Sequence, residues 1–285
     1  MKITGKTLQL GIIGDPVDHS FSPQMHNFIS SYMGEDYTYS AFHVTKGNVG
    51  DAIKGMRAMN IRGINVTAPH KIEVMQYLDE ISPQAKLLGS VNTVVNRNGR
   101  LCGYNTDSEG FYTSLIKAGI EVEGKKVLIL GCGGVTRPII TRFVQAKPKS
   151  ITLLNRTIEK AEKIAEDIFN TTSYRIETKA EKLDFDLVIN TTTAGMEPQL
   201  DALPIDSIAG IDSLDFITEN TSVVDMIYNP EQTRFLYEAK KRGAKTLNGL
   251  GMLIYQGIIA YEIFTDVKLP DNMADLIKKE VFGLK

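Results

Sequence analysis

The 285-residue chain has little of what marks several classes of protein. Its two cysteines, Cys102 and Cys132, give neither a disulfide framework nor a repeated metal-ligand spacing. Charge of one sign is also scarce, because 32 Lys and Arg residues face 34 Asp and Glu residues, for a formal net charge of −2 at pH 7. Such a chain has no general field for nucleic acid or an anionic membrane. Any anion that it binds must be held by a local cluster of groups.

Long apolar runs are missing as well. The first ten residues lack the apolar core of about 7–15 residues that a signal peptide needs. The longest apolar stretch, residues 250–264, contains polar side chains and is shorter than the roughly 20 residues that span a bilayer. No His-x-x-x-His or paired-cysteine pattern accompanies the four histidines: His19, His26, His43 and His70. We therefore expect a cytosolic, reduced protein with no metal site.

Strand-like and helix-like segments alternate along the chain, which predicts an α/β fold with mostly parallel sheets. A length of 285 residues favours two domains over one core. The expected strands are short apolar segments: residues 8–14, 37–44, 63–67, 90–95, 126–130, 151–154, 187–190 and 222–225. Ser22-Pro23 and Ser82-Pro83 predict the starts of two helices, and Gly34 and Gly89 predict their ends. The chain from residue 249 onward is expected to be helical and to pack on the first domain.

A glycine-rich turn follows the expected strand 126–130. Gly131-x-Gly133-Gly134 stands between that strand and a helix, where backbone N–H groups can approach a pyrophosphate. The third glycine of the usual pattern is replaced by Thr136. A glycine turn with no ligand is the alternative interpretation.

The next strand ends in Asn155-Arg156-Thr157, with Lys160 one turn later. An NAD-binding protein usually has a carboxylate there for the ribose 2′-hydroxyl. A cationic corner instead suits the 2′-phosphate of NADP, which arginine can bind in bidentate fashion. The alternative is that Asn155 and Thr157 cap the next helix while Arg156 lies in solvent. The turn and the basic corner together favour NADP over NAD.

Two segments contain candidate proton-transfer groups. Lys71 follows the strand 63–67, and partial burial would suit an ammonium group there for proton transfer. Asp107 could hold Lys71 in place and accept a substrate hydroxyl. The alternatives are a solvated lysine, and a capping box of Thr106 and Glu109 in which Asp107 only complements the helix dipole.

A long turn precedes the first helix and contains two hydroxyls, Ser20 and Ser22. Hydroxyl groups near a helix N-terminus can bind a carboxylate without adding a cation. Ser22 is in addition expected to cap that helix.

Short motifs in this chain together resemble one family, shikimate dehydrogenase, the NADP-dependent reductase of the pathway to chorismate and the aromatic amino acids. They run in the family's order along nearly the whole chain: HSFSP at 19–23, NVTAPHK at 65–71, SVNTVV at 90–95, YNTD at 104–107, GCGG at 131–134, NRT at 155–157, DMIYNP at 225–230 and NGLGML at 248–253, with Gln256. The resemblance implies a discontinuous substrate domain, 1–107 plus 250–285, and a Rossmann-like NADP domain, 108–249. It also implies a monomer or homodimer that acts on a small molecule, shikimate or 3-dehydroshikimate.

The resemblance further implies roles for individual residues. Lys71 and Asp107 would be the catalytic pair. The substrate-binding residues would be Ser20, Ser22, Asn65, Thr67, Asn92, Tyr228 and Gln256. The residues that bind NADP would be Gly131, Gly133, Gly134, Val135, Asn155, Arg156, Thr157, Lys160, Met226 and Gly249.

The chain departs from the family's pattern in two places. Cys132, Val135 and the helix start Thr136-Arg137-Pro138 differ from the alanine-rich loop usual in the family, and Lys160 stands where arginine is common. Pro138, in the first turn of the next helix, is tolerable because an N–H there has no partner within the helix. Two alternatives remain open. One is a quinate/shikimate dehydrogenase that uses NAD or NADP, and the other is a metabolite sensor that has lost turnover.

Overall fold

The computed structural model describes residues 3–208 and 210–284. They form two compact units: residues up to 106 together with those from 254 on, and residues 107–253 apart from 209. The α/β fold class is confirmed, with a sheet in each unit. None of the helices in the described part of the chain is long and apolar enough to cross a membrane.

The first unit contains a six-stranded sheet. Its strands are β1 (Leu8–Gly14), β2 (Tyr37–His43), β3 (Gly63–Val66), β4 (Glu80–Ile81), β5 (Thr93–Arg97) and β6 (Arg100–Tyr104). Its helical segments are α1 (Ser22–Met33), α2 (Val49–Ala58), the 3-10 helix η1 (Glu73–Tyr77), α3 (Pro83–Leu88), most of α8 (Leu250–Thr265) and α9 (Met273–Phe282). The strand order is β2-β1-β3-β5-β6-β4.

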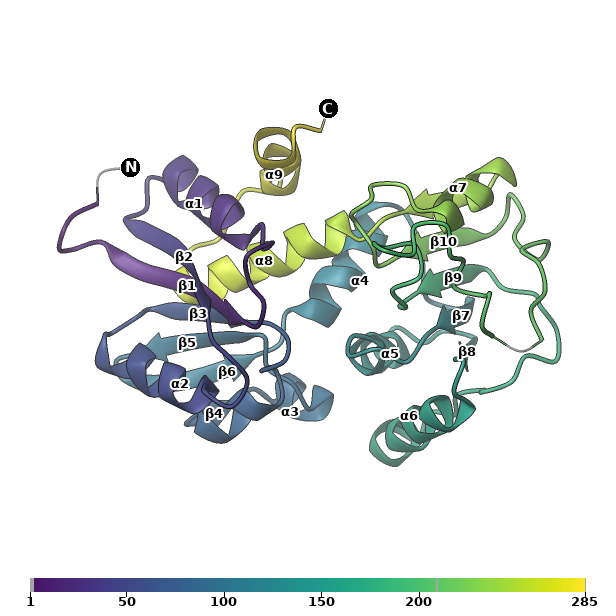
Figure 1. Cartoon of the computed structure of the whole chain (residues 1–285), viewed down its shortest axis with the longest axis horizontal. Helices are drawn as coiled ribbons and strands as arrows, with labels where there is room; N and C mark the ends of the chain where they lie inside the picture. The colour runs from purple at the N-terminus through teal and green to yellow at the C-terminus, as the bar shows by residue number, and fades with distance from the viewer. Residues whose placement is uncertain (1–2, 209, 285) are drawn as a thin grey trace. The chain divides into compact units, whose positions relative to one another are not determined.

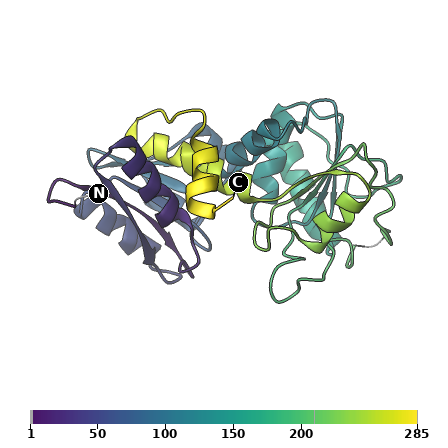
Figure 2. The ribbon, with the colours of Figure 1, turned by 90° about the horizontal axis from the view of Figure 1, so that it is seen from above.

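Helices cover both faces of this sheet. On one face, α1 lies beside α8 and α9, and Phe264 of α8 packs directly over Gly63 of β3 (Figures 1 and 2). On the other face, α2, η1 and α3 close a core around Ile64, Val66 and Val94. Because alternate residues of a strand point to opposite faces, Gly63 and Ile64 belong to different layers.

The first sheet is mostly parallel, as expected, and among its described strands only β5 runs in the opposite direction. β1 pairs in parallel with β2 and β3, whereas β5 is antiparallel to both β3 and β6. The turn between β5 and β6 is Asn98-Gly99, with φ values of 55° and 88°. An Asn-Gly pair accommodates two positive φ angles in a tight hairpin. That dipeptide was the sequence signal for β6, which the pattern of apolar runs had not indicated.

The ends of two early helices test the capping predictions. Ser82 caps α3 as expected by accepting the N–H of Ala85 at 3.2 Å, and Gly89 ends that helix with a left-handed φ of 66°. The prediction for Ser22 was wrong, because the N-cap of α1 is Phe21. The backbone is already in the right-handed helical region at Phe21, and Ser22 is the first residue of α1. The N–H of Ser22 donates to Ser20 Oγ at 3.2 Å.

The second unit contains an all-parallel five-stranded sheet. Its strands are β7 (Lys126–Leu130), β8 (Ser150–Leu154), β9 (Leu187–Asn190), β10 (Ser222–Asp225) and β11 (Lys245–Leu247). Its helices are α4 (Asp107–Lys117), α5 (Thr136–Gln145), α6 (Ile158–Thr172) and α7 (Arg234–Lys241), together with the first residues of α8. The strand order is β11-β10-β9-β7-β8.

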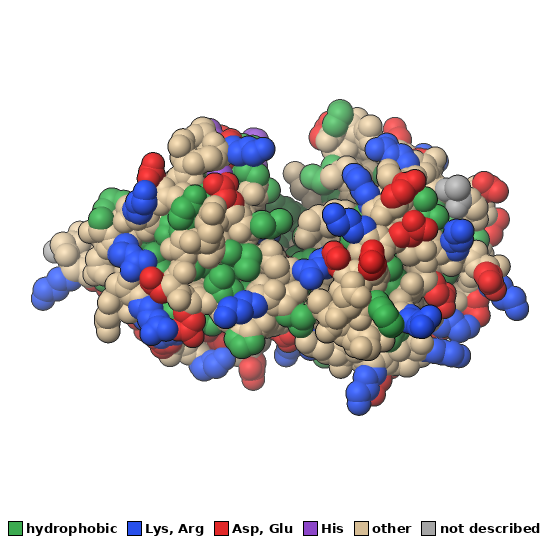
Figure 3. Space-filling model, turned by 90° about the horizontal axis from the view of Figure 1, so that it is seen from below, with side chains coloured by type: hydrophobic (Ala, Val, Ile, Leu, Met, Phe, Trp, Pro, Cys, Tyr) green, Lys and Arg blue, Asp and Glu red, His purple; other side chains and the backbone are tan. Residues whose placement is uncertain are grey.

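Both faces of this sheet are buried, which explains why β7 is a continuous apolar run. Val127 and Ile129 point into the core formed with α4, α5 and α6. Leu128 and Leu130 point into the opposite core, which α7 and the segment after β9 close (Figure 1). On the surface seen in Figure 3, basic and acidic side chains are interspersed over each unit, in keeping with the small net charge.

Candidate active site

Several predicted substrate-binding residues lie at one edge of the first sheet. In the register of the strands, Ile13 pairs with Val66, Asn65 with Thr93, and Thr93 with Tyr104. The carboxyl ends of β1, β3 and β6 and the amino end of β5 therefore share an edge. Residues at or next to these ends come from distant parts of the sequence, and the pairing brings them together: Asn65, Thr67, Asn92 and Thr106.

A buried hydrogen-bond network connects these residues. Asn65 Nδ2 donates to the backbone oxygen of Asn92 and to Thr93 Oγ1, both at 3.2 Å. Asn92 Nδ2 donates to Thr106 Oγ1 at 3.0 Å, and Asn92 Oδ1 accepts the N–H of Thr106 at 2.9 Å. Thr106 Oγ1 also lies 3.5 Å from Gln256 Oε1 of α8. The network explains why α8, far away in sequence, contributes a residue to this edge.

Lys71 lies five residues beyond the end of β3 and is half-buried. Its backbone oxygen accepts the N–H of Val91 at 2.8 Å, which joins the Lys71 loop to the segment before β5. The preceding residue, His70, is buried and donates from Nε2 to the backbone oxygen of Val44 at 2.6 Å. The backbone on either side of Lys71 is thus held in place by the rest of the first unit.

Asp107 begins α4 and is 9% exposed. The capping box of Thr106 and Glu109, the alternative interpretation of this segment, does not form. The N–H and the hydroxyl of Thr106 belong to the Asn92 network, and the carboxylate of Glu109 accepts from Arg142 Nε at 2.7 Å. Lys71 belongs to the first unit and Asp107 to the second. Their pairing stays a prediction.

The carboxyl ends of the second unit's strands also meet at one edge. Leu130 pairs with Leu154 and Asn190, and Asn190 pairs with Asp225. At this edge lies a cavity of about 330 Å³. Its lining combines the glycine turn, the corner after β8, the segment after β9 and a loop beyond it: Gly131, Cys132, Gly133, Asn155, Arg156, Thr157, Lys160, Thr191, Thr192, Thr193, Ala194, Gln199, Leu203, Pro204, Ser207 and Ile208.

The glycine turn is closely packed at its first position. Gly131 has a φ of 107°, and a Cβ there would lie 2.6 Å from Thr192 Cγ2. Thr136, in the position of the usual third glycine, is buried, and its hydroxyl donates to the backbone oxygen of Gly131 at 3.1 Å. That hydroxyl also lies 2.9 Å from Thr191 Oγ1. Two buried hydroxyls therefore tie the turn to the end of β9.

The charge of the cavity suits a phosphorylated ligand. Arg156 and Lys160 line it, and no Asp or Glu is among its lining residues. The alternative interpretation holds in part: Thr157 is the N-cap residue of α6 and Arg156 is exposed, but the Thr157 side chain makes no capping hydrogen bond. Asn155 Nδ2 donates to the Thr157 backbone oxygen at 2.9 Å. The first N–H groups of α5 likewise receive no side-chain cap from Val135. Helix N-termini and arginine are both suited to anions, so the residues present fit a phosphorylated dinucleotide.

Four residues predicted to bind NADP do not line this cavity: Gly134, Val135, Met226 and Gly249. Met226 and Gly249 follow β10 and β11, and they are close neighbours, because a Cβ on Gly249 would collide with the backbone oxygen of Met226. The sequence reasoning did not name Thr191, Thr192 and Thr193. They directly follow β9, and polar residues just after a strand of a parallel sheet lie at the edge where such sheets bind ligands. This position in the sequence could have identified them.

Asp225 holds the backbone beside Met226. Its Oδ1 accepts from Asn190 Nδ2 at 3.0 Å and from the N–H of Ile227 at 3.1 Å, and its Oδ2 accepts from Thr233 Oγ1 at 2.7 Å. Burial raises the pKa of this carboxyl to about 6, although the three hydrogen bonds lower it. The side chain thus links β9, β10 and the start of α7.

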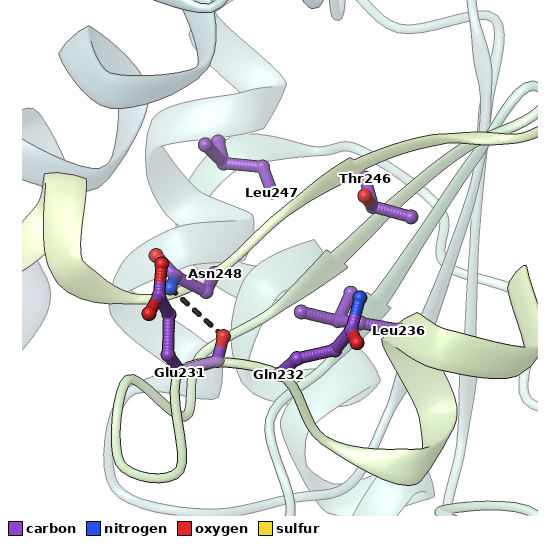
Figure 4. A pocket seen from close by; sticks show the side chains of 6 residues that line it. All are labelled: Glu231, Gln232, Leu236, Thr246, Leu247 and Asn248. Carbon is purple, nitrogen blue, oxygen red and sulfur yellow. Dashed lines mark hydrogen bonds between the residues drawn. The ribbon is translucent and has the colours of Figure 1, made fainter. Parts of the chain in front are cut away.

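A second cavity, of about 470 Å³, lies along β11 and the start of α7 (Figure 4). Its lining residues include the carboxylate of Glu231 and no Lys or Arg, so it does not suit a phosphate. Asn248 Nδ2 donates to the Glu231 backbone oxygen at 3.0 Å, a bond between two of its lining residues. Among the described residues, no group of three or more His, Cys, Asp or Glu side chains could hold a metal ion.

The parallel sheet of the second unit, with its glycine turn and basic cavity, defines a nucleotide-binding α/β protein. Comparisons with known proteins give the family. Residues 12–94 match the shikimate dehydrogenase substrate binding domain, 114–230 match shikimate / quinate 5-dehydrogenase, and 249–281 match the shikimate 5′-dehydrogenase C-terminal domain. The chain belongs to the shikimate dehydrogenase family.

Individual relatives are similar over almost the whole chain. The shikimate dehydrogenase (NADP(+)) of Methanococcus maripaludis strain S2 is 44% identical over 287 residues, with 99% of each chain covered. A crystal structure of shikimate dehydrogenase in complex with NADP+ is 40% identical, with a TM-score of 0.89 and 98% of each chain covered. Shikimate 5-dehydrogenase of Listeria monocytogenes, in complex with shikimate and NAD, is 37% identical, with a TM-score of 0.89 and 98% of each chain covered.

Proposed function

We propose that this chain is an NADP-dependent oxidoreductase that reversibly reduces 3-dehydroshikimate to shikimate. The observation that carries the assignment is the basic cavity at the carboxyl edge of β7, β8 and β9, in a chain whose relatives are NADP-dependent shikimate dehydrogenases. A bound NADPH supplies the hydride that the protein itself cannot. The protein's part is to bind, to orient and to move a proton.

The second unit is the cofactor domain in this proposal. The N–H groups of the glycine turn and of the start of α5 bind the pyrophosphate, and Arg156, Thr157 and Lys160 bind the 2′-phosphate. Met226 and Gly249 flank the nicotinamide. The two cations line a cavity that has no Asp or Glu among its described lining residues, which supports NADP over NAD.

The first unit is the substrate domain. Ser20 and Ser22 hold the substrate carboxylate, with Tyr228 near it, and Asn65, Thr67, Asn92 and Gln256 face the ring hydroxyls. Lys71, as an ammonium ion, stabilises the charge that develops on the carbonyl oxygen and gives it a proton. Asp107 orients Lys71 and a neighbouring hydroxyl. In the oxidative direction Lys71 must start neutral to accept that proton.

A steady-state comparison of four substrate pairs tests the proposal. Shikimate and quinate are each assayed with NADP+ and with NAD+ by the absorbance of the reduced cofactor. We expect the highest kcat/KM for shikimate with NADP+. Higher kcat/KM for quinate, or for NAD+, would favour the alternative quinate/shikimate dehydrogenase. No turnover in any pair would favour a metabolite sensor.

A further inference from the structure

His26, on the buried face of α1, is fully enclosed and has an unusual lack of partners. Neither of its ring nitrogens has a hydrogen-bond partner among the described residues. Burial lowers the pKa of its imidazole to about 3, so the ring is neutral in the physiological range. Buried polar groups are nearly always hydrogen-bonded, and an exception calls for an explanation.

The contacts of the His26 ring are instead with neighbouring aromatic rings. His26 stacks on Tyr39 of β2, with ring centroids 4.3 Å apart and an angle of 5° between the planes. Tyr261 and Phe264 of α8 lie on the same imidazole, at 5.9 Å and 6.2 Å. The Tyr39 ring of β2 is therefore stacked on an imidazole of α1 against which α8 also packs, and this stacking restricts the position of its phenol oxygen.

That phenol oxygen lies beside two predicted substrate-binding residues. It donates to Asn65 Oδ1 at 2.8 Å. Burial raises the pKa of the phenol, and the Ser22 side chain is near enough to lower it. Both N–H groups of the Asn65 amide are used by Asn92 and Thr93. Only the second lone pair of Asn65 Oδ1 then remains for a substrate hydroxyl, so the amide can accept but not donate.

We propose that Tyr39 is a positioning residue for substrate binding, whose phenol oxygen, held in place by the stacked His26 ring, orients Ser22 and Asn65 together. The inference rests on the proposed function, because that function assigns Ser22 and Asn65 to substrate binding. It adds a residue that does not touch the substrate. Tyr39 is 3% exposed and acts through its two partners.

Tyr39→Phe removes the oxygen and keeps the ring on His26. We expect KM and Kd for shikimate to rise about tenfold, which corresponds to one lost hydrogen bond of about 1.4 kcal/mol. kcat should change less than about threefold, and Kd for NADP+ should not change. A merely structural role would lower stability without this split between substrate and cofactor.

Tyr261→Phe is the matched control. Tyr261 is equally buried beside His26, and its hydroxyl donates to Ser30 Oγ at 3.1 Å, away from the predicted site residues. We expect a similar fall in melting temperature and an unchanged KM. Tyr39→Phe with wild-type KM, or Tyr261→Phe with an equal rise in KM, would overturn the inference.

A double-mutant cycle of Tyr39→Phe with Asn65→Ala tests whether Tyr39 affects substrate binding through Asn65. If Tyr39 acts partly through Asn65, adding Tyr39→Phe to Asn65→Ala should raise the shikimate Kd by clearly less than the single change does. Full additivity would contradict that coupling. A wild-type protein that does not oxidise shikimate would instead refute the proposed function, so the two failures are distinguishable.

Discussion

Lys71 is the residue on which the proposed chemistry depends most. Because its role is realised in the transition state, Lys71→Ala should lower kcat severely and leave the Kd for shikimate within about tenfold. Calorimetric titration and steady-state kinetics measure the two quantities. Lys54→Ala, an exposed lysine of α2 paired with Asp51, is the control and should behave as wild type. Normal kcat with a large rise in KM would contradict the role.

Arg156 should select the phosphorylated cofactor. Arg156→Ala is expected to weaken NADPH binding about ten- to a hundredfold, the usual range for one charge-assisted hydrogen-bonded pair, and to leave NADH binding nearly unchanged. Fluorescence titration of both cofactors measures the difference. Arg175→Ala, an exposed arginine stacked on Phe169 of α6, is the matched control. An equal loss for both cofactors would remove Arg156 from the 2′-phosphate.

Asp225 should make stability depend on pH in the opposite sense from most carboxyl groups. Its folded-state pKa of about 6 lies above the 3.8 of an unperturbed aspartic acid, because burial disfavours the charged form, so the folded state binds the proton more tightly. The stabilisation that Asp225 gives the folded state is fully present below about pH 4. It is lost as pH rises through 6, which lowers the free energy of unfolding by about 3 kcal/mol.

Asp225→Asn keeps the shape and removes this ionisation. The difference in unfolding free energy between variant and wild type, from urea denaturation at several pH values, should change in the variant's favour between pH 4 and 6. A difference that stays constant over this range would show that Asp225 does not titrate there.

Single residues also show where sequence reasoning succeeds. Ser82 and Ser22 have the same Ser-Pro signature, yet only Ser82 caps its helix with its own side chain. Ser20 supplies the competing oxygen at the start of α1. The local signature therefore predicts that a helix begins there, and the neighbouring side chains decide which residue caps it.

At the scale of elements, α8 packs on β3 without a spacer. A Cβ on Gly63 would lie 2.2 Å from the Phe264 ring, so Gly63→Ala should push the ring away and cost about 1–3 kcal/mol of unfolding free energy. Phe264→Leu alone should also lower the free energy of unfolding. The double variant should lose less than the sum, because the smaller side chain makes room for the new methyl group.

Urea denaturation measures this cycle. Gly5→Ala is a control at a glycine whose added Cβ would meet nothing within 4 Å. Additive losses in the double variant would mean that the two side chains do not compete for the same space.

Elements with a strong apolar run were predictable, and short ones were not. β7 and β8 were expected nearly as observed, because residues 127–130 and 151–154 are buried and, apart from Thr152, apolar. β4 and β11, of two and three residues, carry no such pattern. β6 is longer, but Arg100 and Tyr104 at its ends leave only a short apolar run between them. The Asn-Gly turn before it is the clearest sequence signal of where it starts.

At the scale of the whole molecule, each unit has its own sheet and core. The sequence indicated two domains from length, and the motif resemblance indicated that the chain returns to the first after the second. Networks that join distant segments, such as Asn92 with Thr106 and Gln256, could not be derived from spacing, because strand register decides which loop ends meet. The cavity in the second unit was predictable in part, from its glycine turn and basic corner.

Transfer of label from substrate to cofactor tests the central claim most directly. The protein is incubated with NADP+ and shikimate that carries deuterium on the carbon bearing the 3-hydroxyl group, and the reduced cofactor is examined by mass spectrometry. The account predicts one deuterium in each NADPH formed and one 3-dehydroshikimate for each NADPH. No NADPH, or NADPH without deuterium, would contradict it.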